Sequence, residues 1–298
     1  MCGFVGYVND TPDKSVNEKI IKDMADRIRH RGPDQDDYYV DSSVSLGFRR
    51  LSIIDLDGGS QPILNEDGTK VLVFNGEIYN YQPIREELIK KGHVFRTKTD
   101  SEVLLHGYEE YGCELLNKLR GMFAFVIWDS TEKKLFGARD IFGIKPFFYY
   151  LKNGNFLFGS EIKSFLSNPL FEKELNEERL PDYLCFEYIP TTETMFKNVY
   201  KMEPGSYITF SDGKFETKRY FTPEYSIDET KSIEYWEDLI DETFKGSTVA
   251  HGISDVEVGC FLSSGVDSSY VVHEMAKRND VKTFSVGYAE EKYSELSH

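Results

Sequence analysis

The chain has 298 residues, of which 40% are hydrophobic and 29% are charged, so it has room for about two globular domains, each with its own core. Its 35 basic and 51 acidic residues give a net charge of −16, and Lys and Arg are nowhere concentrated, so we expect no nucleic-acid partner. No apolar run approaches the ~18–20 residues that span a bilayer, and the N-terminus lacks the pattern of a signal peptide, so we expect no membrane partner.

The first part of the chain predicts a mixture of strands and helices. In the segment 15–29, Val16, Ile20, Met24 and Ile28 recur at a spacing of four residues, which predicts a helix with one buried face. Asn153 and Gly154 separate two apolar runs and predict a hairpin. This order favours a layered α+β domain over residues 2–210. Further helices are predicted at 81–91 and 101–111, and strands at 4–8, 44–55, 70–80, 122–129, 134–140, 147–151 and 155–160.

The pattern changes after a polar segment, 211–230, which is rich in turn residues and which we interpret as a linker. A helix at 232–248 is followed by a strand at 256–262, a Ser/Gly loop, a helix at 268–278 and a strand at 282–288. This alternation predicts the beginning of a parallel α/β sheet in a second domain, 231–298. Because a parallel sheet needs both faces covered, we expect that the chain ends partway through this domain.

The four cysteines are scattered, without the spacing of a metal site or a disulfide framework. We interpret Cys113, Cys185 and Cys260 as small buried residues in a reducing compartment, which predicts a cytoplasmic location. Cys2 has a further interpretation. Removal of Met1 would leave a free α-amine, with a pKa of about 7.7–8.0, beside a thiol whose pKa is normally about 8.5. One residue would then supply both a nucleophile and its base.

Several motifs follow this cysteine in a fixed order. They are MCGFVGY at the N-terminus, HRGPD at 30–34, RRLSIID at 49–55, NGEIYN at 75–80, TDSE at 99–102 and ARDIFGIKPFFYY at 138–150. Together they resemble the class II, N-terminal-nucleophile (Ntn) glutamine amidotransferases, and within these the asparagine synthetases. The resemblance extends over the whole chain. It implies an αββα glutaminase domain, followed by the start of an ATP-pyrophosphatase-type synthetase domain.

The resemblance also implies roles for residues of the glutaminase site. Cys2 would be the nucleophile, with the side-chain amide of Asn75 and the backbone N–H of Gly76 as oxyanion donors. Arg50 would hold the α-carboxylate of glutamine, because its guanidinium offers two parallel donors. Arg49 is the alternative, as an ordinary surface residue. The strand that continues the glutamine site would be Leu51, Ser52, Ile53 and Ile54.

Two carboxylates complete the implied substrate site. Glu77 and Asp100 correspond to the residues that bind the substrate α-ammonium, although a surface carboxylate and a helix cap are the plainer interpretations of each. His30 and Arg31 invite a catalytic interpretation. We interpret them instead as part of a turn that supports the pocket.

A second motif, LSSGVDSS at 262–269, lies between a predicted strand and a predicted helix, where backbone N–H groups favour an anion. It is no Walker A loop, but it resembles the SGGxDS loop of the family, with Ser264 in place of a glycine. That replacement restricts φ at one position. An ordinary Ser/Gly turn is the alternative. The resemblance implies an ATP site with Mg²⁺ at Asp267, formed by Leu262, Ser263, Ser264, Gly265, Val266, Asp267, Ser268, Ser269 and Val286.

For the complete protein, the resemblance implies a ligase that makes asparagine, glutamate, AMP and pyrophosphate from aspartate, glutamine and ATP. The acceptor could instead be another carboxylate. Two further alternatives are a class II enzyme with a phosphosugar domain, which the strand–loop–helix motif disfavours, and a non-catalytic module, which the intact site motifs disfavour. The oligomeric state, including a homodimer, stays open.

Overall fold

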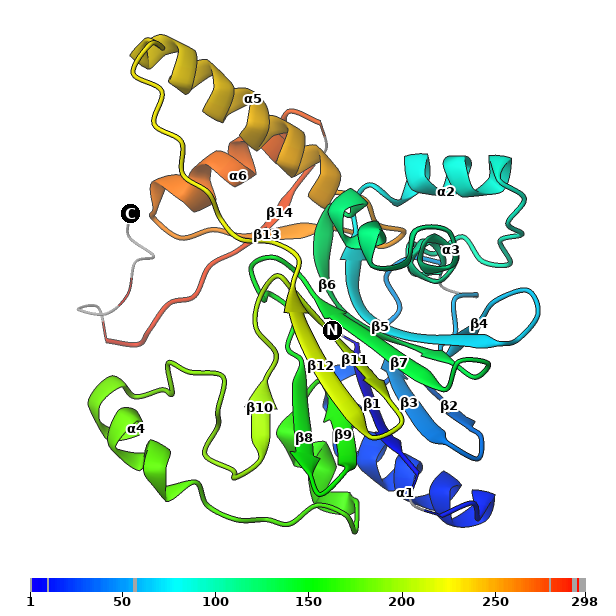
Figure 1. Ribbon diagram of the computed structural model, residues 1–298. Coiled ribbons are helices and arrows are strands. Elements are labelled where there is room, and N and C mark those ends of the chain that lie inside the picture. Colours follow the sequence, from blue (N-terminus) through cyan, green and yellow to red (C-terminus); the bar gives the residue numbers. More distant parts are fainter. Residues whose placement is uncertain (1, 10, 56–57, 279, 291–293, 295–298) are drawn as a thin grey trace. The chain divides into compact units, whose positions relative to one another are not determined.

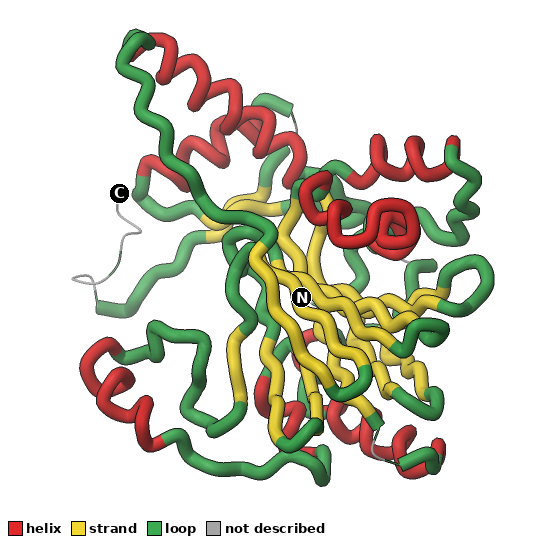
Figure 2. The backbone as a smooth tube through the Cα atoms, in the orientation of Figure 1, coloured by secondary structure: helices red, strands yellow, loops and turns green. Residues whose placement is uncertain are grey.

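The computed structural model describes residues 2–9, 11–55, 58–278, 280–290 and 294, and the chain divides into two compact units, 1–223 and 224–298. We describe each unit by itself. The first contains two six-stranded sheets with helices packed on their outer faces, as Figures 1 and 2 show. The expected α+β fold is therefore confirmed.

The first sheet has the strand order β10-β8-β9-β1-β3-β2, and all its neighbouring strands are antiparallel. β1 lies near its centre because the GFVGYV segment is buried almost throughout and pairs on both sides. The strands are β1 (Gly3–Val8), β2 (Gln35–Val40), β3 (Val44–Arg50), β8 (Phe148–Lys152), β9 (Asn155–Gly159) and β10 (Val199–Lys201).

The second sheet has the order β12-β11-β7-β6-β5-β4, and it is also antiparallel. β5 and β6 pair over nine residues each and form its core. The strands are β4 (Ile63–Leu64), β5 (Lys70–Ile78), β6 (Gly121–Asp129), β7 (Lys134–Arg139), β11 (Ser206–Ser211) and β12 (Lys214–Arg219).

Three apolar clusters hold the layers together. The first lies between the two sheets and contains residues such as Phe4, Val73 and Phe158. The second joins the outer face of the second sheet to α2 and α3, and the third joins the outer face of the first sheet to α1. The layers are therefore helix, sheet, sheet, helix. The helices of this unit are α1 (Lys14–Asp26), α2 (Tyr81–Lys90), α3 (Glu102–Tyr111) and α4 (Leu180–Phe186), and the short 3₁₀ helices are η1 (Arg29–Arg31), η2 (Gly112–Lys118), η3 (Ile162–Ser167) and η4 (Glu177–Arg179).

The segment 211–230 is only partly irregular. Residues 214–219 form β12, which pairs with β11 from Ser206↔Arg219 to Ser211↔Lys214, so the prediction of a linker is wrong there. Asp212 and Gly213, both with positive φ, form the two-residue turn of the hairpin between β11 and β12 and are not the start of a linker. The prediction for Cys113 and Cys185 is also wrong, because both are exposed.

The second unit contains α5 (Ile233–His251), β13 (Gly259–Phe261), α6 (Val266–Ala276) and β14 (Lys282–Phe284). β13 and β14 are parallel, with Cys260 opposite Thr283, as the predicted βαβ pattern requires. Cys260 is buried, but α5 buries none of its residues, and Ile233 is 73% exposed. Two strands give this unit little core.

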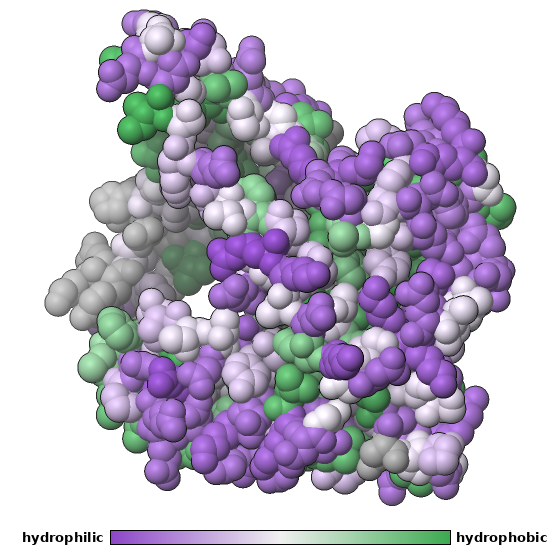
Figure 3. Space-filling view, in the orientation of Figure 1, coloured by the Kyte–Doolittle hydropathy of each residue, from purple (hydrophilic) through white to green (hydrophobic). Residues whose placement is uncertain are grey.

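The surface in Figure 3 is mostly hydrophilic, above all over α2 and α3, in keeping with the high charge content. Within the described ranges, no helix combines the length and the apolar character that a bilayer crossing needs.

Candidate active site

Cys2 lies at the entrance of β1, next to the end of β3, because Gly3 pairs with Arg49. Its Sγ accepts a hydrogen bond from the backbone N–H of Leu51 (3.3 Å) and lies 3.4 Å from the Leu51 carbonyl oxygen. Burial raises the pKa of the Cys2 thiol, and the Leu51 N–H opposes this only in part. The thiol therefore needs a nearby base. Met1, whose removal would expose such a base, lies outside the described residues.

The HRGPD segment supports this end of the sheet. Arg31 Nε donates to the Cys2 carbonyl (2.9 Å), and its Nη1 donates to Glu161 Oε1 (3.0 Å). Gly32 packs so tightly that a Cβ atom would lie 2.3 Å from the Arg49 carbonyl carbon. The segment thus fixes the backbone around the thiol without contributing a catalytic group.

Arg50 ends β3, and its side chain is buried. Its guanidinium donates from Nη1 to Gln35 Oε1 (3.0 Å), and from Nη2 to the carbonyls of Ile54 (3.1 Å) and Asp55 (2.6 Å). These contacts fix the plane of the guanidinium. Arg49, in contrast, forms ion pairs with Asp26 and Asp36 and does not line the pocket.

β5 carries the two expected oxyanion donors. Asn75 lies on the same strand face as Val71 and Val73, which pack in the cluster between the sheets that Cys2 also contacts. Its Nδ2 atom is buried without a hydrogen-bond partner among the described residues. Such a donor is costly unless a ligand accepts from it. At Gly76 a Cβ atom would lie 2.2 Å from the Met122 carbonyl oxygen, so no side chain fits there.

Glu77, which is half-buried, and Asp100, which is buried, form a pair of neighbouring carboxylates. Asp100 Oδ2 accepts from the backbone N–H of Ile78 (2.7 Å), which ties the N-terminal side of α3 to β5. Burial raises the pKa of both carboxyl groups, and the proximity of Asp100 raises that of Glu77 further. A cation placed between them would reverse both shifts. The pair is therefore suited to an ammonium group.

Lys145 lies in the GIKPFFYY part of the motif at 138–150, and the sequence predicted no role for it. Its side chain is buried. Burial lowers the pKa of the Lys145 ammonium, while the charges of Glu77 and Cys2 act in the opposite direction, so the three groups lie within electrostatic reach. Asp140 positions this turn by accepting from the Lys145 backbone N–H (3.0 Å). The feature of the sequence that could have pointed to Lys145 is that it is a single lysine between apolar residues.

One pocket brings most of the expected glutamine-site residues together. Ser52 and Asn75 do not line it; the Ser52 backbone N–H donates to Asp34 (2.9 Å). The expected residues in the lining are Cys2, Arg50, Leu51, Ile53, Ile54, Gly76, Glu77 and Asp100. The lining also includes Phe48, Gly59, Gln61, Phe74, Thr99 and Ser101, which sequence reasoning did not select.

The Ser/Gly loop of the second unit joins β13 to α6. The backbone N–H of Ser263 and its hydroxyl contact Ser268 Oγ (3.2 and 2.9 Å), and the Gly265 N–H donates to Ser263 Oγ (3.2 Å). Ser264 has no positive φ, so replacing a glycine causes no strain there. The hydroxyls of Ser263, Ser268 and Ser269 are hydrogen-bonded within the loop. The N-terminus of α6, with Asp267 in its first turn, is the kind of helix end that fits a phosphate group.

The other residues expected at the nucleotide lie around this loop. The Leu262 backbone N–H donates to the Phe284 carbonyl (2.9 Å), which joins the ends of the two parallel strands. Val266 and Val286 are exposed, so neither encloses a pocket by itself. Ser269 Oγ donates to the Gly265 carbonyl (2.9 Å).

Comparisons with known proteins agree with this arrangement. Residues 239–298 match the family model of asparagine synthase. Two Bacillus subtilis proteins named glutamine-hydrolyzing asparagine synthetase 1 and 2 are 45% and 38% identical; the alignments cover 99% and 96% of this chain, but 47% and 40% of those proteins. The chain thus spans about half the length of the curated relatives it matches.

The fold also has a solved counterpart. The B. subtilis glutamine phosphoribosylpyrophosphate amidotransferase, in complex with ADP and GMP, superposes with a TM-score of 0.54 over 98% of this chain and 68% of that one, at 16% identity. This supports the Ntn-type fold alone. Residues 1–221 match the family model of the glutamine amidotransferase domain, so the chain belongs to this family.

Proposed function

We propose that this chain hydrolyses the side-chain amide of glutamine to glutamate and ammonia, with Cys2 as the nucleophile. The observation that carries the proposal is the convergence of a thiol, a fixed guanidinium and two carboxylates in one pocket. Free glutamine carries the matching groups, which are an α-carboxylate, an α-ammonium and a side-chain amide.

The chemistry requires a base beside Cys2. After removal of Met1, the α-amine of Cys2 takes the thiol proton, and Sγ attacks the amide carbon. The oxygen becomes negative and accepts hydrogen bonds from Asn75 Nδ2 and the Gly76 N–H. Collapse of this intermediate releases ammonia, which takes the proton, and leaves a γ-glutamyl thioester. Water then attacks the thioester and releases glutamate and the thiol.

The rest of the pocket selects an amino acid as substrate. Arg50 binds the α-carboxylate, while Glu77 and Asp100 bind the α-ammonium. Leu51, Ile53 and Ile54 form the wall between these two ends, and Ser52 belongs to the same segment without lining the pocket. Glutamine is a zwitterion, and each part of the pocket binds only one of its two charged groups. Both Arg50 and the pair Glu77 and Asp100 are therefore needed.

For the complete protein, we propose that the ammonia amidates aspartate to asparagine at the expense of ATP, which gives AMP and pyrophosphate. The names of the two relatives and the position of the Ser/Gly loop at the N-terminus of α6 support this. Residues 263–269 would hold the phosphates, Asp267 would act through Mg²⁺, and Leu262 and Val286 would border the adenine. The chemistry that ATP supplies is activation of the acceptor carboxylate. Four free cysteines support a cytoplasmic location.

The proposal is tested by glutamate release from the purified 298-residue chain. Cys2→Ser should lower the rate by at least about 10³-fold, because a hydroxyl is a poor nucleophile without a strong base. Cys113→Ser, at an exposed cysteine, is the matched control and should keep the wild-type rate. Equal loss in both variants, or no loss in Cys2→Ser, would exclude the proposed nucleophile.

A further inference from the structure

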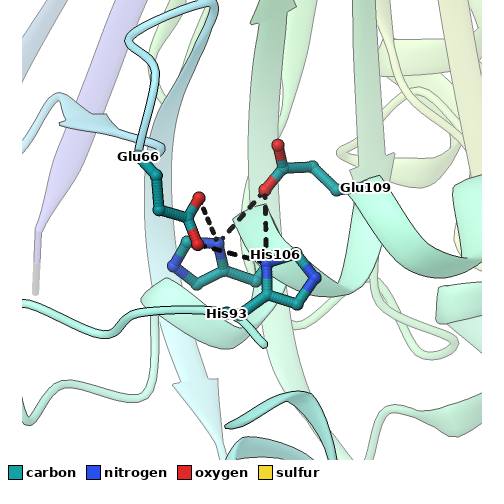
Figure 4. A group of neighbouring side chains, drawn as sticks. All are labelled: Glu66, His93, His106 and Glu109. Atoms are coloured by element: carbon teal, nitrogen blue, oxygen red, sulfur yellow. Dashed lines mark hydrogen bonds and ion pairs between the residues drawn. The ribbon is translucent and has the colours of Figure 1, made fainter. Parts of the chain in front are cut away.

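Four side chains outside the glutaminase pocket converge on one point beside α3. They are Glu66 from the loop between β4 and β5, His93 from the segment after α2, and His106 and Glu109 from α3 (Figure 4). One nitrogen or oxygen atom of each lies within 4.8 Å of the corresponding atoms of the others. His106 is only 1% exposed, whereas Glu66 at the rim is exposed, so the point is enclosed but open to solvent on one side.

Three of the four nitrogen–oxygen separations are close to those in the ligand shell of a tetrahedral metal ion. Nδ1 of His106 lies 3.3 Å from Glu66 Oε2 and 3.1 Å from Glu109 Oε2. Nδ1 of His93 lies 3.2 Å from Glu66 Oε1 and 3.9 Å from Glu109 Oε2. With zinc–ligand bonds of about 2.0–2.1 Å, neighbouring tetrahedral ligands are separated by roughly 3.3–3.4 Å. Nδ1 of each imidazole therefore faces the same two carboxylates, at this spacing except for the longer contact between His93 and Glu109.

The nitrogen and oxygen atoms of these side chains that point away from the common point lie near other polar side chains. Nε2 of His93 is hydrogen-bonded to Glu110 Oε1 at 3.1 Å. Nε2 of His106 lies 3.5 Å from Glu102 Oε1 and has no hydrogen-bond partner within the described part of the chain. Oε1 of Glu109 accepts from Asn65 Nδ2 (2.7 Å). A carboxylate that is hydrogen-bonded to the outer nitrogen of a histidine fixes the tautomer that leaves the inner nitrogen able to bind a metal, and Glu110 does this for His93.

A network of protonated histidines is the alternative. Burial opposes a charge on His106, but Glu102 and Glu109 outweigh it and raise the pKa of this imidazole to about 9 in the absence of a metal. Charge-assisted N–H···O bonds are normally about 2.7–2.9 Å long. The inner contacts are all longer, at 3.1–3.9 Å, which fits ligands around an ion better than imidazolium–carboxylate pairs.

We propose that Glu66, His93, His106 and Glu109 bind a Zn²⁺-class divalent transition ion. Two imidazoles and two carboxylates suit Zn²⁺, and the two negative charges neutralise it. Four protein ligands leave no open position, so the ion has a structural role. It ties two loops to α3 and thereby supports Glu102, whose carboxylate accepts from the backbone N–H groups of residues 96 and 97.

The test is calorimetric titration of Zn²⁺ into the EDTA-treated, dialysed 298-residue chain, together with its thermal midpoint. We expect one ion per chain and a higher Tm with Zn²⁺, because the ion binds the folded state only. His93→Gln and Glu66→Gln, at accessible positions, should each weaken binding by at least about tenfold and remove most of the Tm rise. Co²⁺ in place of Zn²⁺ should give the intense visible bands of a tetrahedral site.

The matched control is His273→Gln, which removes an exposed histidine that also lies next to a glutamate, Glu274. It should bind Zn²⁺ like the wild type. Circular dichroism of the metal-free variants checks folding, and Glu66→Gln keeps the test decisive if His93→Gln fails to fold. A wild-type chain that binds no Zn²⁺ at millimolar concentration would overturn the proposal. Binding that survives both cluster substitutions, or weak octahedral Co²⁺ bands, would also overturn it.

Discussion

Neighbouring arginines at the end of β3 differ in what their side chains contact. Arg50 lines the pocket with its guanidinium held by Gln35, whereas Arg49 forms ion pairs with Asp26 and Asp36. Of the two side chains, that of Arg50 is the one that lines the pocket. Adjacent residues on a strand point to opposite faces, and this alternation separates the two roles.

We expect Arg50→Lys to raise the KM for glutamine by roughly tenfold or more, because a single ammonium cannot reproduce a two-pronged, charge-assisted contact. Steady-state glutamate release measures this. Arg49→Lys is the control and should leave KM close to that of the wild type. If both variants shift KM equally, the α-carboxylate is bound elsewhere.

The carboxylate pair Glu77 and Asp100 predicts that the KM for glutamine depends on pH. Since burial raises the pKa of Glu77, part of it is protonated near neutral pH, and only the ionised form attracts an ammonium. The KM for glutamine should therefore fall as pH rises through the raised pKa. Glu77→Gln should raise KM and flatten its pH profile. A wild-type KM that is constant across weakly acidic to weakly basic pH would contradict the assigned role.

The raised pKa of Glu77 also makes the stability of the folded chain depend on pH, and the direction of this dependence follows from the direction of the shift. A folded-state pKa above the unfolded value of about 4.3 means that the folded chain holds this proton more tightly. The contribution of Glu77 is fully present below that unfolded value and is lost as pH rises toward the raised pKa. Thermal melts of the wild type and Glu77→Gln should therefore show the variant gaining stability relative to the wild type as pH rises.

The sequence motifs named Cys2, Arg50, Gly76, Glu77 and Asp100 in advance, and all five line the same pocket. Lys145 shows where the sequence was insufficient, whereas for Arg31 the sequence predicted the supporting turn but not the contact that it makes. Lys145 comes within reach of Cys2 only through the pairing of distant strands, and Arg31 contacts the Cys2 backbone across 29 residues of sequence. Such contacts depend on tertiary structure, which local patterns do not encode.

At the scale of elements, the regular patterns predicted type and order well, and boundaries less well. The four-residue spacing over Val16, Ile20, Met24 and Ile28 located α1, but Val16 is 43% exposed, whereas Ile21 is buried. A helix turns about 100° per residue, so a spacing of four drifts by about 40° at each step. The buried face therefore passes from one row of residues to the next.

β12 was missed because its side chains are polar and mostly exposed at the edge of a sheet. The alternation of apolar and polar residues that identifies a strand is weak in an edge strand that is held mainly by backbone hydrogen bonds. We expect hydrogen exchange to distinguish this strand from a linker. One alternating set of amides in 214–219, those bonded to β11, should exchange slowly, while amides in 224–229 should exchange rapidly. Uniformly fast exchange across both segments would contradict the strand and support the predicted linker.

At the scale of the whole molecule, the proposed glutamine chemistry depends on the first unit alone. All three apolar clusters and every residue that lines the pocket belong to 1–223. The second unit buries few of its described residues and contributes the Ser/Gly loop and one pair of parallel strands. The alternation of a strand, a Ser/Gly loop, a helix and a second strand predicted this parallel pair from the sequence.

The central claim is that Cys2, with a free α-amine, forms a thioester with glutamine. The direct measurement is the mass of the N-terminal tryptic peptide, which ends at Lys14, after a short reaction of the chain with glutamine and an acid quench. The account predicts a peptide that begins at Cys2 and carries one glutamyl group. An active chain whose peptide still begins with Met1, or whose glutamyl group lies on another residue, would contradict it.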